Sequence, residues 1–302
     1  MRFSPIHTLR PSLYSWASIL IFLCLCLWAC SGGNGAEKAS SIWPSAEESG
    51  QGELRALYVA AEGFAYRDEA GNLTGFTVEL LRNFSDFAKE KYGVEVEIHF
   101  EEEADWREFY RRIAEGEDGM IGLGNVTITE ERKEELVFSP PYMTNMASLI
   151  THRDSPELLE LEDLASRFEG RNALAFEGTL HEERLRALTR EYFPDAEVYK
   201  AHSNDEIIER VSSADEYFAY IDMYNYQRAA ERGFPLQHHP VADLSSEQFG
   251  YIMPLETTWE APIRAYFEQG DGLIHSREYR SLMVEHLGEE LAAILLSARY
   301  SD

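Results

Sequence analysis

The chain has 302 residues, of which 27 are basic and 54 acidic, giving a formal net charge of −27. Its 44% hydrophobic and 12% aromatic residues are enough to bury one or two cores, as in one two-lobed domain or two small domains. So large a negative charge argues against nucleic acids and anionic lipid surfaces as partners, because both would repel the chain.

The first 29 residues have the pattern of a secretory signal. Arg2 and Arg10 precede an uncharged apolar run from Ser18 to Ala29, which is too short for a comfortable membrane span. The run ends in Leu-Trp-Ala-Cys, which is typical of a bacterial lipoprotein signal. We therefore expect residues 1–29 to be removed and Cys30 to be lipidated, with plain secretion as the alternative.

All three cysteines lie in or at the end of this signal, so the mature chain would contain no disulfide and no thiolate. Residues 31–53 are rich in Gly, Ser and Glu, a composition typical of a flexible tether. We expect residues 30–53 to connect a membrane lipid to a folded domain. The protein would then be exported and held at the periplasmic or extracellular face of a cell-envelope membrane.

Strand-like and helix-like patterns alternate from residue 54 onward. The apolar run of 54–61 and the strict alternation of 94–100 predict strands, and the apolar stripe of 76–93 predicts a helix that ends at Gly93. Turn residues lie between the first strand and this helix. The same criteria predict helices over 105–116 and 129–136, and strands over 119–128 and 147–154.

The alternation then repeats. Helices are predicted over 161–168, 180–193, 204–214, 223–233, 259–269 and 276–287, and strands over 172–178, 196–201, 216–222 and 249–254. This order indicates an α/β fold. We expect two lobes, each a mixed sheet flanked by helices: lobe 1 from 54 to 150, lobe 2 from 151 to 248, and a return to lobe 1 from 249 to 302.

A candidate anion site lies where the strand of 119–128 ends. Asn125 and Thr127 alternate on one face of the strand end, Thr129 is a good helix N-cap, and Arg132 falls in the first turn. Arginine binds both oxygens of a carboxylate in a fork, and ligands bind at the carboxyl ends of strands in open α/β sheets. The alternative is a surface ion pair between this arginine and a nearby acid, namely Glu101, Glu134 or Glu135.

Two motifs resemble those of the extracellular solute-binding proteins of family 3, the polar-amino-acid receptors of bacterial ABC importers. The pattern F-x-Y-x-D-x-x-G-x-L-x-G-F is present at 64–76, and T-I-T-x-E-R followed by F-S-x-P-Y is present at 127–142. The resemblance covers roughly residues 54–288. It implies a type II periplasmic binding protein, in which two crossing strands join two α/β lobes that close on a ligand.

The resemblance also assigns residue roles. Arg132 matches the arginine that grips the ligand α-carboxylate, Thr127 the hydroxyl beside it, and Asn125 a neighbouring polar contact. Gly178 and Thr179 match a turn that opens a helix and presents its backbone N–H groups to the same carboxylate. Closure is therefore expected to bring these two groups of residues together.

Asp222 matches the acid that receives the ligand ammonium, with a helix N-cap as its alternative role. Trp106 matches an aromatic platform under the ligand side chain, with core packing as the alternative, and Phe64 of the first motif is also assigned to the ligand. Four positions depart from the family pattern, which leaves the side-chain end of the site unassigned: Tyr58, Ala61, Leu180 and Tyr217.

These assignments predict a monomeric substrate-binding lipoprotein of an ABC importer, which captures an amino acid or similar small carboxylate and delivers it to a permease. We expect no enzymatic activity, no cofactor and no metal site, because the histidines are scattered. One alternative is a periplasmic enzyme resembling the cyclohexadienyl dehydratases, which have glutamate at the position of Asp222. The other is an envelope sensory or interaction module, although we expect no sensor or transglycosylase domain after the last predicted helix.

Overall fold

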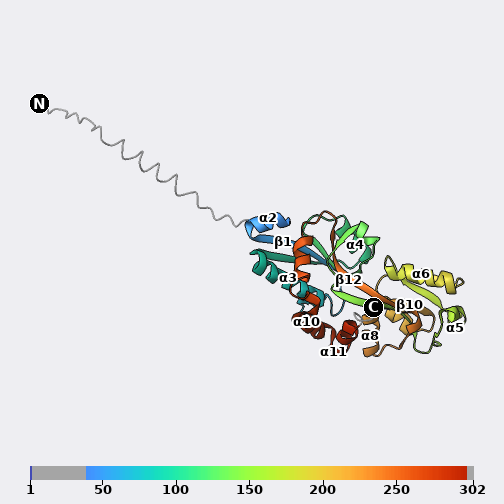
Figure 1. Cartoon of the computed structure of the whole chain (residues 1–302). Helices are drawn as coiled ribbons and strands as arrows, with labels where there is room; N and C mark the ends of the chain where they lie inside the picture. Colours follow the sequence, from blue (N-terminus) through green and yellow to red (C-terminus); the bar gives the residue numbers. More distant parts are fainter. Residues whose placement is uncertain (2–38, 298–302) are drawn as a thin grey trace. The chain divides into compact units, whose positions relative to one another are not determined.

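The computed structural model describes Met1 and residues 39–297 (Figure 1). The expected signal peptide, the lipidation of Cys30 and the first part of the expected tether lie outside the described residues. Within the described part of the chain, no helix combines the length and the apolar character needed to cross a membrane.

The segment from Trp43 to Glu53 is folded, which corrects the expected tether. It forms helix α2 (Trp43–Ser49) and the start of strand β1 (Gln51–Tyr58). The Trp43 ring is buried 5.0 Å from that of Trp259, whose indole N–H donates to the Ser41 carbonyl. The polar composition concealed this packing, because one tryptophan anchors an otherwise hydrophilic helix.

Lobe 1 is built from the described residues before β7 (Met143–His152) and after β12 (Leu244–Pro254). Its strands β4 (Glu95–Glu102), β1 and β5 (Met120–Thr127) lie side by side in that order and are parallel. The hairpin of β2 (Tyr66–Arg67) and β3 (Leu73–Thr74) leads into the long helix α3 (Phe76–Tyr92). Five helices complete the lobe: α3 (Phe76–Tyr92), α4 (Trp106–Ala114), α9 (Glu260–Phe267), α10 (Arg277–Leu287) and α11 (Glu289–Ser297).

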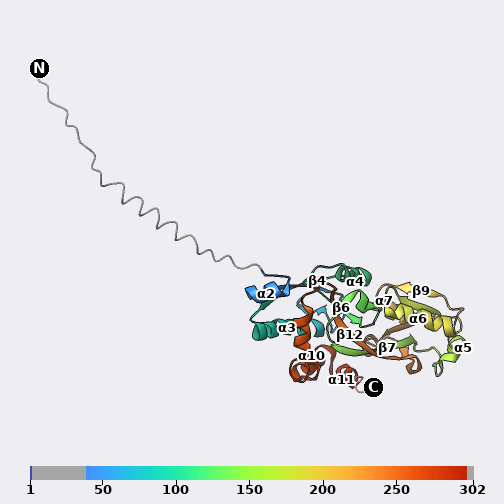
Figure 2. The same cartoon turned by 45° about the horizontal axis from the view of Figure 1, so that its top comes forward.

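Lobe 2 lies between the two crossing strands. Its parallel strands are β10 (Tyr217–Asp222), β8 (Asn172–Phe176) and β9 (Val198–Ala201), and β11 (Leu236–His238) pairs with β7. The helices α5 (Leu164–Arg167) and α6 (Leu180–Tyr192) lie at the end of the domain away from α3 and α10 in both views (Figures 1 and 2). The remaining helices are α7 (Asn204–Ser213) and α8 (Met223–Glu231).

The two crossing strands join the lobes, as expected. The first half of β7 pairs antiparallel with β12 and its second half with β10, while β12 also pairs with β5. The described strands therefore form one continuous ten-stranded sheet, β4-β1-β5-β12-β7-β10-β8-β9 with β6 (Leu136–Phe138) and β11 attached. Separate clusters of buried apolar side chains give each lobe its own core.

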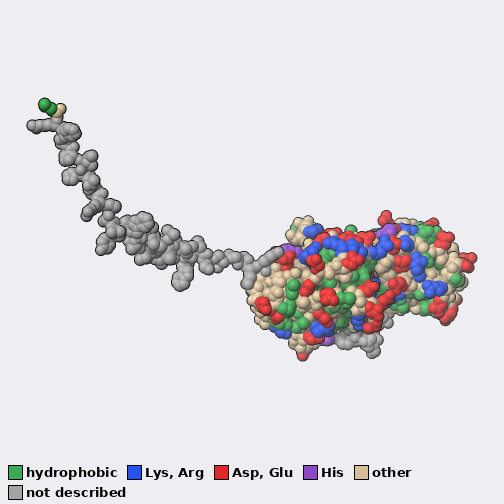
Figure 3. Space-filling model, turned by 90° about the horizontal axis from the view of Figure 1, so that it is seen from above, with side chains coloured by type: hydrophobic (Ala, Val, Ile, Leu, Met, Phe, Trp, Pro, Cys, Tyr) green, Lys and Arg blue, Asp and Glu red, His purple; other side chains and the backbone are tan. Residues whose placement is uncertain are grey.

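Short elements differ most from the expectation. The helix predicted over 129–136 is a single 3-10 turn, η1 (Arg132–Glu134), and a 3-10 turn η2 (Leu161–Asp163) opens the helix predicted over 161–168. Two more turns, η3 (Pro240–Ala242) and η4 (Leu273–His275), and the helix α11 were not predicted. On the face seen in Figure 3, acidic and basic side chains are intermixed, which agrees with a solvated, acid-rich surface.

Candidate functional site

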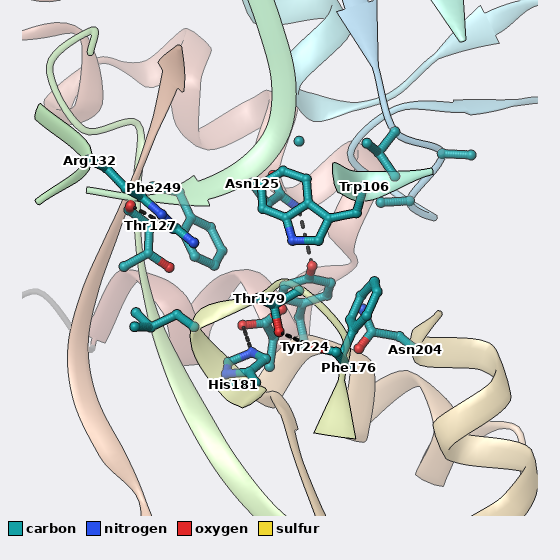
Figure 4. Close-up of a pocket in the computed structure, with 16 residues that line it drawn as sticks. Trp106, Asn125, Thr127, Arg132, Phe176, Thr179, His181, Asn204, Tyr224 and Phe249 are labelled. Atoms are coloured by element: carbon teal, nitrogen blue, oxygen red, sulfur yellow. Dashed lines mark hydrogen bonds and ion pairs between the residues drawn. The ribbon is translucent and has the colours of Figure 1, made fainter. Parts of the chain in front are cut away.

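A cavity of about 100 Å³ lies between the lobes, where the carboxyl ends of β5, β8 and β10 come together (Figure 4). Side chains from both lobes line it. Six of the eight predicted ligand-binding residues are among them: Trp106, Asn125, Thr127, Arg132, Thr179 and Asp222. The predicted site is therefore a real constellation in the folded chain, and its place agrees with the general preference of ligands for strand ends.

Arg132 lies at the cavity wall and not on the solvated surface. Its backbone N–H donates to Thr129 Oγ1 at 3.2 Å, although the N-cap of the 3-10 turn is Glu131 and not Thr129 as predicted. The guanidinium donates through Nη1 to the Thr127 carbonyl at 3.0 Å and lies 5.8 Å from the centre of the Tyr110 ring. The guanidinium is partly buried, and this burial lowers its pKa.

The alternative of a surface ion pair fails for Arg132. Glu101 pairs instead with Arg112, and Glu135 accepts a hydrogen bond from the Tyr110 hydroxyl at 2.7 Å. Across the described residues, no carboxylate lies within ion-pair distance of the Arg132 guanidinium. A partly buried cation with no anion at ion-pair distance carries a desolvation cost, so the site is electrostatically suited to a negatively charged group.

A buried ion pair lies next to Thr127. Its hydroxyl donates at 3.3 Å to Oε2 of Glu247, a residue of the crossing strand β12, and the other carboxylate oxygen pairs with Arg184 of α6. Glu247 is 4% exposed, and burial lowers the pKa of Arg184. The sequence did not indicate this acid. It ties the Thr127 hydroxyl at the cavity wall to a charged side chain of the other lobe.

Asn125 is held in an unusual backbone conformation. Its φ is 51°, and among the described residues it is the one residue other than glycine that has a positive φ. The side chain accepts a hydrogen bond from the Tyr142 hydroxyl at 2.9 Å and donates one to the Tyr224 hydroxyl at 3.2 Å. Left-handed conformations of this kind persist where the surroundings fix them, and here two tyrosines do so. The predicted polar contact is thus also a bridge between lobes.

Asp222 faces the cavity floor with its carboxylate nearly buried. Its Oδ1 accepts a hydrogen bond from Asn145 Nδ2 at 2.6 Å and lies 3.1 Å from His181 Nε2. Although Asp222 occupies the N-cap position of α8, its side chain caps no backbone N–H there. The N-cap alternative is therefore wrong, and the carboxylate is directed at the other polar groups of the site.

The turn that opens α6 differs from the expectation. The Gly178 N–H donates to Glu182 Oε2 at 2.8 Å, and the Thr179 hydroxyl donates to the Phe176 carbonyl at 2.8 Å. Gly178 has a φ of +79° and does not line the cavity, because its Cα faces Arg107 of lobe 1. Thr179 does line it. The Gly178 N–H group that the resemblance assigned to a carboxylate is already occupied.

Of the two aromatic residues predicted at the ligand, Trp106 lines the cavity and Phe64 does not. Trp106 begins α4, lines the cavity and is partly exposed, and in Figure 4 its indole extends over the cavity from the lobe 1 side. Phe64 does not line the cavity, because it is 1% exposed in the lobe 1 core, packed against Phe76 and against Tyr224 at 4.6 Å. It supports a cavity residue and does not touch the cavity itself.

Several lining residues were missed. His181 follows Leu180 directly, and its Nδ1 is buried without a hydrogen-bond partner among the described residues. Tyr224 lies two residues after Asp222, and burial raises the pKa of its hydroxyl strongly, so it stays protonated. Proximity to predicted site residues was the one available signal for these two. Phe176, Asn204 and Phe249 also line the cavity.

Comparison with known proteins gives a consistent picture. The family described as bacterial extracellular solute-binding proteins, family 3, matches residues 56–285. The chain is 25% identical to Bacillus subtilis "Probable ABC transporter extracellular-binding protein YckB", over 70% of this chain and 69% of that protein. It is 27% identical to membrane-bound lytic murein transglycosylase F of Pseudomonas fluorescens over 71% of this chain, but it spans just 39% of that protein.

Solved structures agree on the fold. An ancestral arginine-binding protein bound to arginine superimposes with a TM-score of 0.63 at 20% identity, covering 78% of this chain and 98% of that one. At this identity the likeness shows a shared fold. It also shows that the part of the chain with this fold corresponds to nearly the whole of that protein.

Proposed function

Because the chain belongs to the bacterial extracellular solute-binding proteins of family 3, we propose that it captures an amino acid or similar small carboxylate between its lobes. It has the type II two-lobed fold of the amino-acid-binding proteins. The observation that carries the proposal is Arg132, a partly buried guanidinium at the cavity wall with no carboxylate partner among the described residues.

The carboxylate of the ligand would bind Arg132 in a fork, beside the hydroxyl of Thr127. Charge-assisted hydrogen bonds of this kind are roughly twice as strong as neutral ones. The ligand anion supplies the charge that the buried guanidinium lacks, so binding removes a cost that the empty cleft carries. No bond is made or broken in this step.

The ammonium of the ligand would bind Asp222. Asn145 and the His181 ring hold this carboxylate by its Oδ1 from two sides, which fixes its orientation toward the cavity. Selectivity then follows from the pairing of both ends, because a molecule that lacks one charge leaves a buried group unpaired. Arg132 comes from lobe 1 and Asp222 from lobe 2, so the ligand itself holds the lobes together.

The partner would be an ABC permease that accepts the ligand from the closed protein. The relatives named as ABC transporter binding proteins support this partner. A lipid on Cys30 would hold the protein at the outer face of the membrane as a monomer, which accounts for the apolar run and cysteine near the N-terminus. Radiolabelled palmitate incorporation in the wild type and in Cys30→Ala tests the anchor.

A second candidate function is an envelope interaction module. The similarity to a membrane-bound lytic murein transglycosylase, over 71% of this chain, favours it. In that role the protein would contact or activate another envelope protein instead of delivering a solute to a permease. The enzyme alternative has weaker support, because position 222 carries aspartate and not the glutamate of the dehydratases that the sequence resembles.

A thermal-shift screen of the twenty amino acids and of small carboxylates tests the proposal. A receptor is stabilised by its ligand by an amount that grows with the logarithm of the ligand's excess over Kd, and it returns the ligand unchanged. Chromatography of the recovered ligand separates receptor from enzyme. A stabilising ligand that is consumed would overturn the receptor function, and the absence of any shift would favour the interaction module.

A further inference from the structure

The ligand cavity does not end at the residues described above. A second cavity of about 790 Å³ adjoins the first, and the two share lining residues, including Ala60, Ala61 and Trp106 of lobe 1. Two of these shared residues are alanines, whose side chains take up little space where the cavities adjoin. We call the first the inner cavity and the second the outer cavity.

Size separates the two cavities. The inner one, at about 100 Å³, suits the carboxylate, Cα and nitrogen of one amino-acid residue. The outer one, at about 790 Å³, lies within the range of pockets that hold drug-sized molecules, roughly 300–1,000 Å³. A free amino acid anchored at Arg132 would leave most of this space to water. A longer molecule would fill it.

Two side-chain amides at the outer cavity lack partners. Asn204 Oδ1 and Asn225 Nδ2 are shielded from solvent and make no hydrogen bond to the described residues. Buried polar atoms without partners cost about 1–3 kcal/mol, and the torsion of an asparagine amide is broad enough to turn either atom toward a ligand. One atom is an acceptor and the other a donor. A peptide group offers the complementary pair, one N–H and one C=O.

Charge at the outer cavity is the opposite of that at Arg132. Four carboxylates line it, against the guanidiniums of Arg228 and Arg232. Glu62 is paired with Arg232, whereas Arg228 donates to the backbone carbonyl of His286. The other carboxylates come from both lobes, Glu102 from lobe 1 and Asp205 and Glu209 from lobe 2. A cation between them would offset the repulsion of like charges across the cleft.

We propose that the preferred ligand is a short peptide, with its C-terminal residue in the inner cavity and its N-terminal ammonium among the carboxylates of the outer cavity. The inference rests on the proposed function, because Arg132 still binds the terminal carboxylate. With a peptide, Asp222 would accept the N–H of the last peptide bond in place of the ammonium of a single amino acid, because the ammonium then lies among the outer carboxylates. The amides of Asn204 and Asn225 would bind the next peptide group. A free amino acid would then occupy the inner cavity in the way that the C-terminal residue of the peptide does, and it would leave the outer cavity unused.

Calorimetry on the full chain tests this with four probes: the twenty free amino acids, a random tripeptide pool, the same pool N-acetylated, and the same pool C-amidated. The tripeptide pool should yield ligands that bind at least about tenfold tighter than any free amino acid. N-acetylation should weaken these ligands about fivefold or more, because it removes the ammonium. Free amino acids that bind as tightly as the best tripeptide would overturn the peptide inference and leave the proposed function standing.

A variant pair locates the effect. Ala104 is exposed and lines the outer cavity but not the inner one. Ala104→Trp should therefore fill the outer cavity and weaken tripeptide binding about tenfold, while the affinity for free amino acids should change less than about twofold. Ala70→Trp, at an exposed hairpin position, is the matched control and should change neither. Equal losses for both ligand types would contradict the inference. Undiminished binding of the C-amidated pool would overturn the carboxylate anchor, and with it the proposed function.

Discussion

The side-chain amide of Asn125 in lobe 1 donates a hydrogen bond to the Tyr224 hydroxyl of lobe 2 at 3.2 Å, at the edge of the ligand cavity. The side-chain oxygen of Asn125 accepts a hydrogen bond from the Tyr142 hydroxyl, so both polar atoms of the amide are held. The lobes are therefore joined beside the ligand by a side-chain contact as well as by the crossing strands. Closure and ligand binding should be linked through this pair.

Tyr224→Phe should weaken ligand binding about two- to tenfold, because a hydrogen bond contributes about 0.5–1.5 kcal/mol. The closed arrangement loses its bridge while the ring still packs on Phe64. Calorimetric titration measures the change. Tyr226→Phe is the matched control, because Tyr226 is on the same helix and packs on His238 away from the cavity. Equal affinities in Tyr224→Phe and wild type would refute the link.

Arg132→Ala should weaken binding of every carboxylate ligand by at least about tenfold, or 1.4 kcal/mol. Arg132→Lys should recover part of the loss, since lysine keeps the charge but cannot form the two-pronged contact. Arg111→Ala on the exposed face of α4 is the control, and it should bind normally.

Asp222→Asn should weaken binding of α-amino acids about tenfold or more, while the matching 2-hydroxy acids lose little. The reason is that the amide can no longer balance the ligand ammonium, whereas the hydroxy acid has no such charge. Competition titrations with both ligand series give the ratio directly. Asp243→Asn, which disturbs the Asp243–His238 pair elsewhere in lobe 2, serves as the control. Parallel losses in the two series would remove Asp222 from the ammonium role.

Stability should fall in mild acid because of His239, a fully buried residue of lobe 2. Burial lowers its pKa from 6.5 to about 4, and the ring contacts Thr151 Oγ1 at 2.8 Å and accepts from the Leu158 N–H at 3.2 Å. The folded-state pKa lies below the unfolded one. The contribution of neutral His239 to the free energy of unfolding is therefore complete above pH 6.5 and is lost as the pH falls toward 4.

The loss should be on the order of 3 kcal/mol across that window, and urea unfolding between pH 7.5 and 4.5 measures it. His239→Gln removes the titrating group, so its free energy of unfolding should fall less steeply with acid than that of the wild type. Identical slopes for the two proteins would contradict the assignment.

Trp43→Ala should cost about 3–5 kcal/mol of stability, the usual range for deleting a buried large aromatic side chain. Trp43 packs against Trp259 and Tyr92, so α2 belongs to the core of lobe 1. Thermal unfolding followed by circular dichroism records the change. Glu47→Ala on the exposed side of the same helix should leave the melting temperature nearly unchanged. A silent Trp43→Ala would mean that the segment is the tether suggested by its composition.

Periodicity predicted the long elements of both lobes, because each helix and strand buries one face against the same core. Short elements escaped it, and three of them show why. The turn η1 has too few residues to show a period, β6 is three residues long, and α2 is mostly polar apart from Trp43. Local composition cannot report a contact between residues 43 and 259, which lie more than two hundred positions apart.

That Thr127 and Arg132 lie together at the cavity was predictable, because the two residues are close in sequence. The rest depends on distant contacts. Asp222 meets Asn145 across 77 positions, and Glu247 meets Thr127 across 120. Phe64 was placed at the ligand because it shares a motif with true turn residues, whereas its ring supports Tyr224 from the core. No local pattern distinguishes a residue at the ligand from one directly behind it.

The antiparallel ladder of β7 and β12 has a practical consequence for measuring motion. Its main-chain amides are bonded within the connection between the lobes, so they should exchange slowly with deuterium whether the cleft is open or shut. Amides at the start of α6 and around Asn125 face the gap and should be slowed by ligand alone. The exchange rates of the ladder amides thus provide an internal reference, against which the opening of the cleft can be measured without any attached probe.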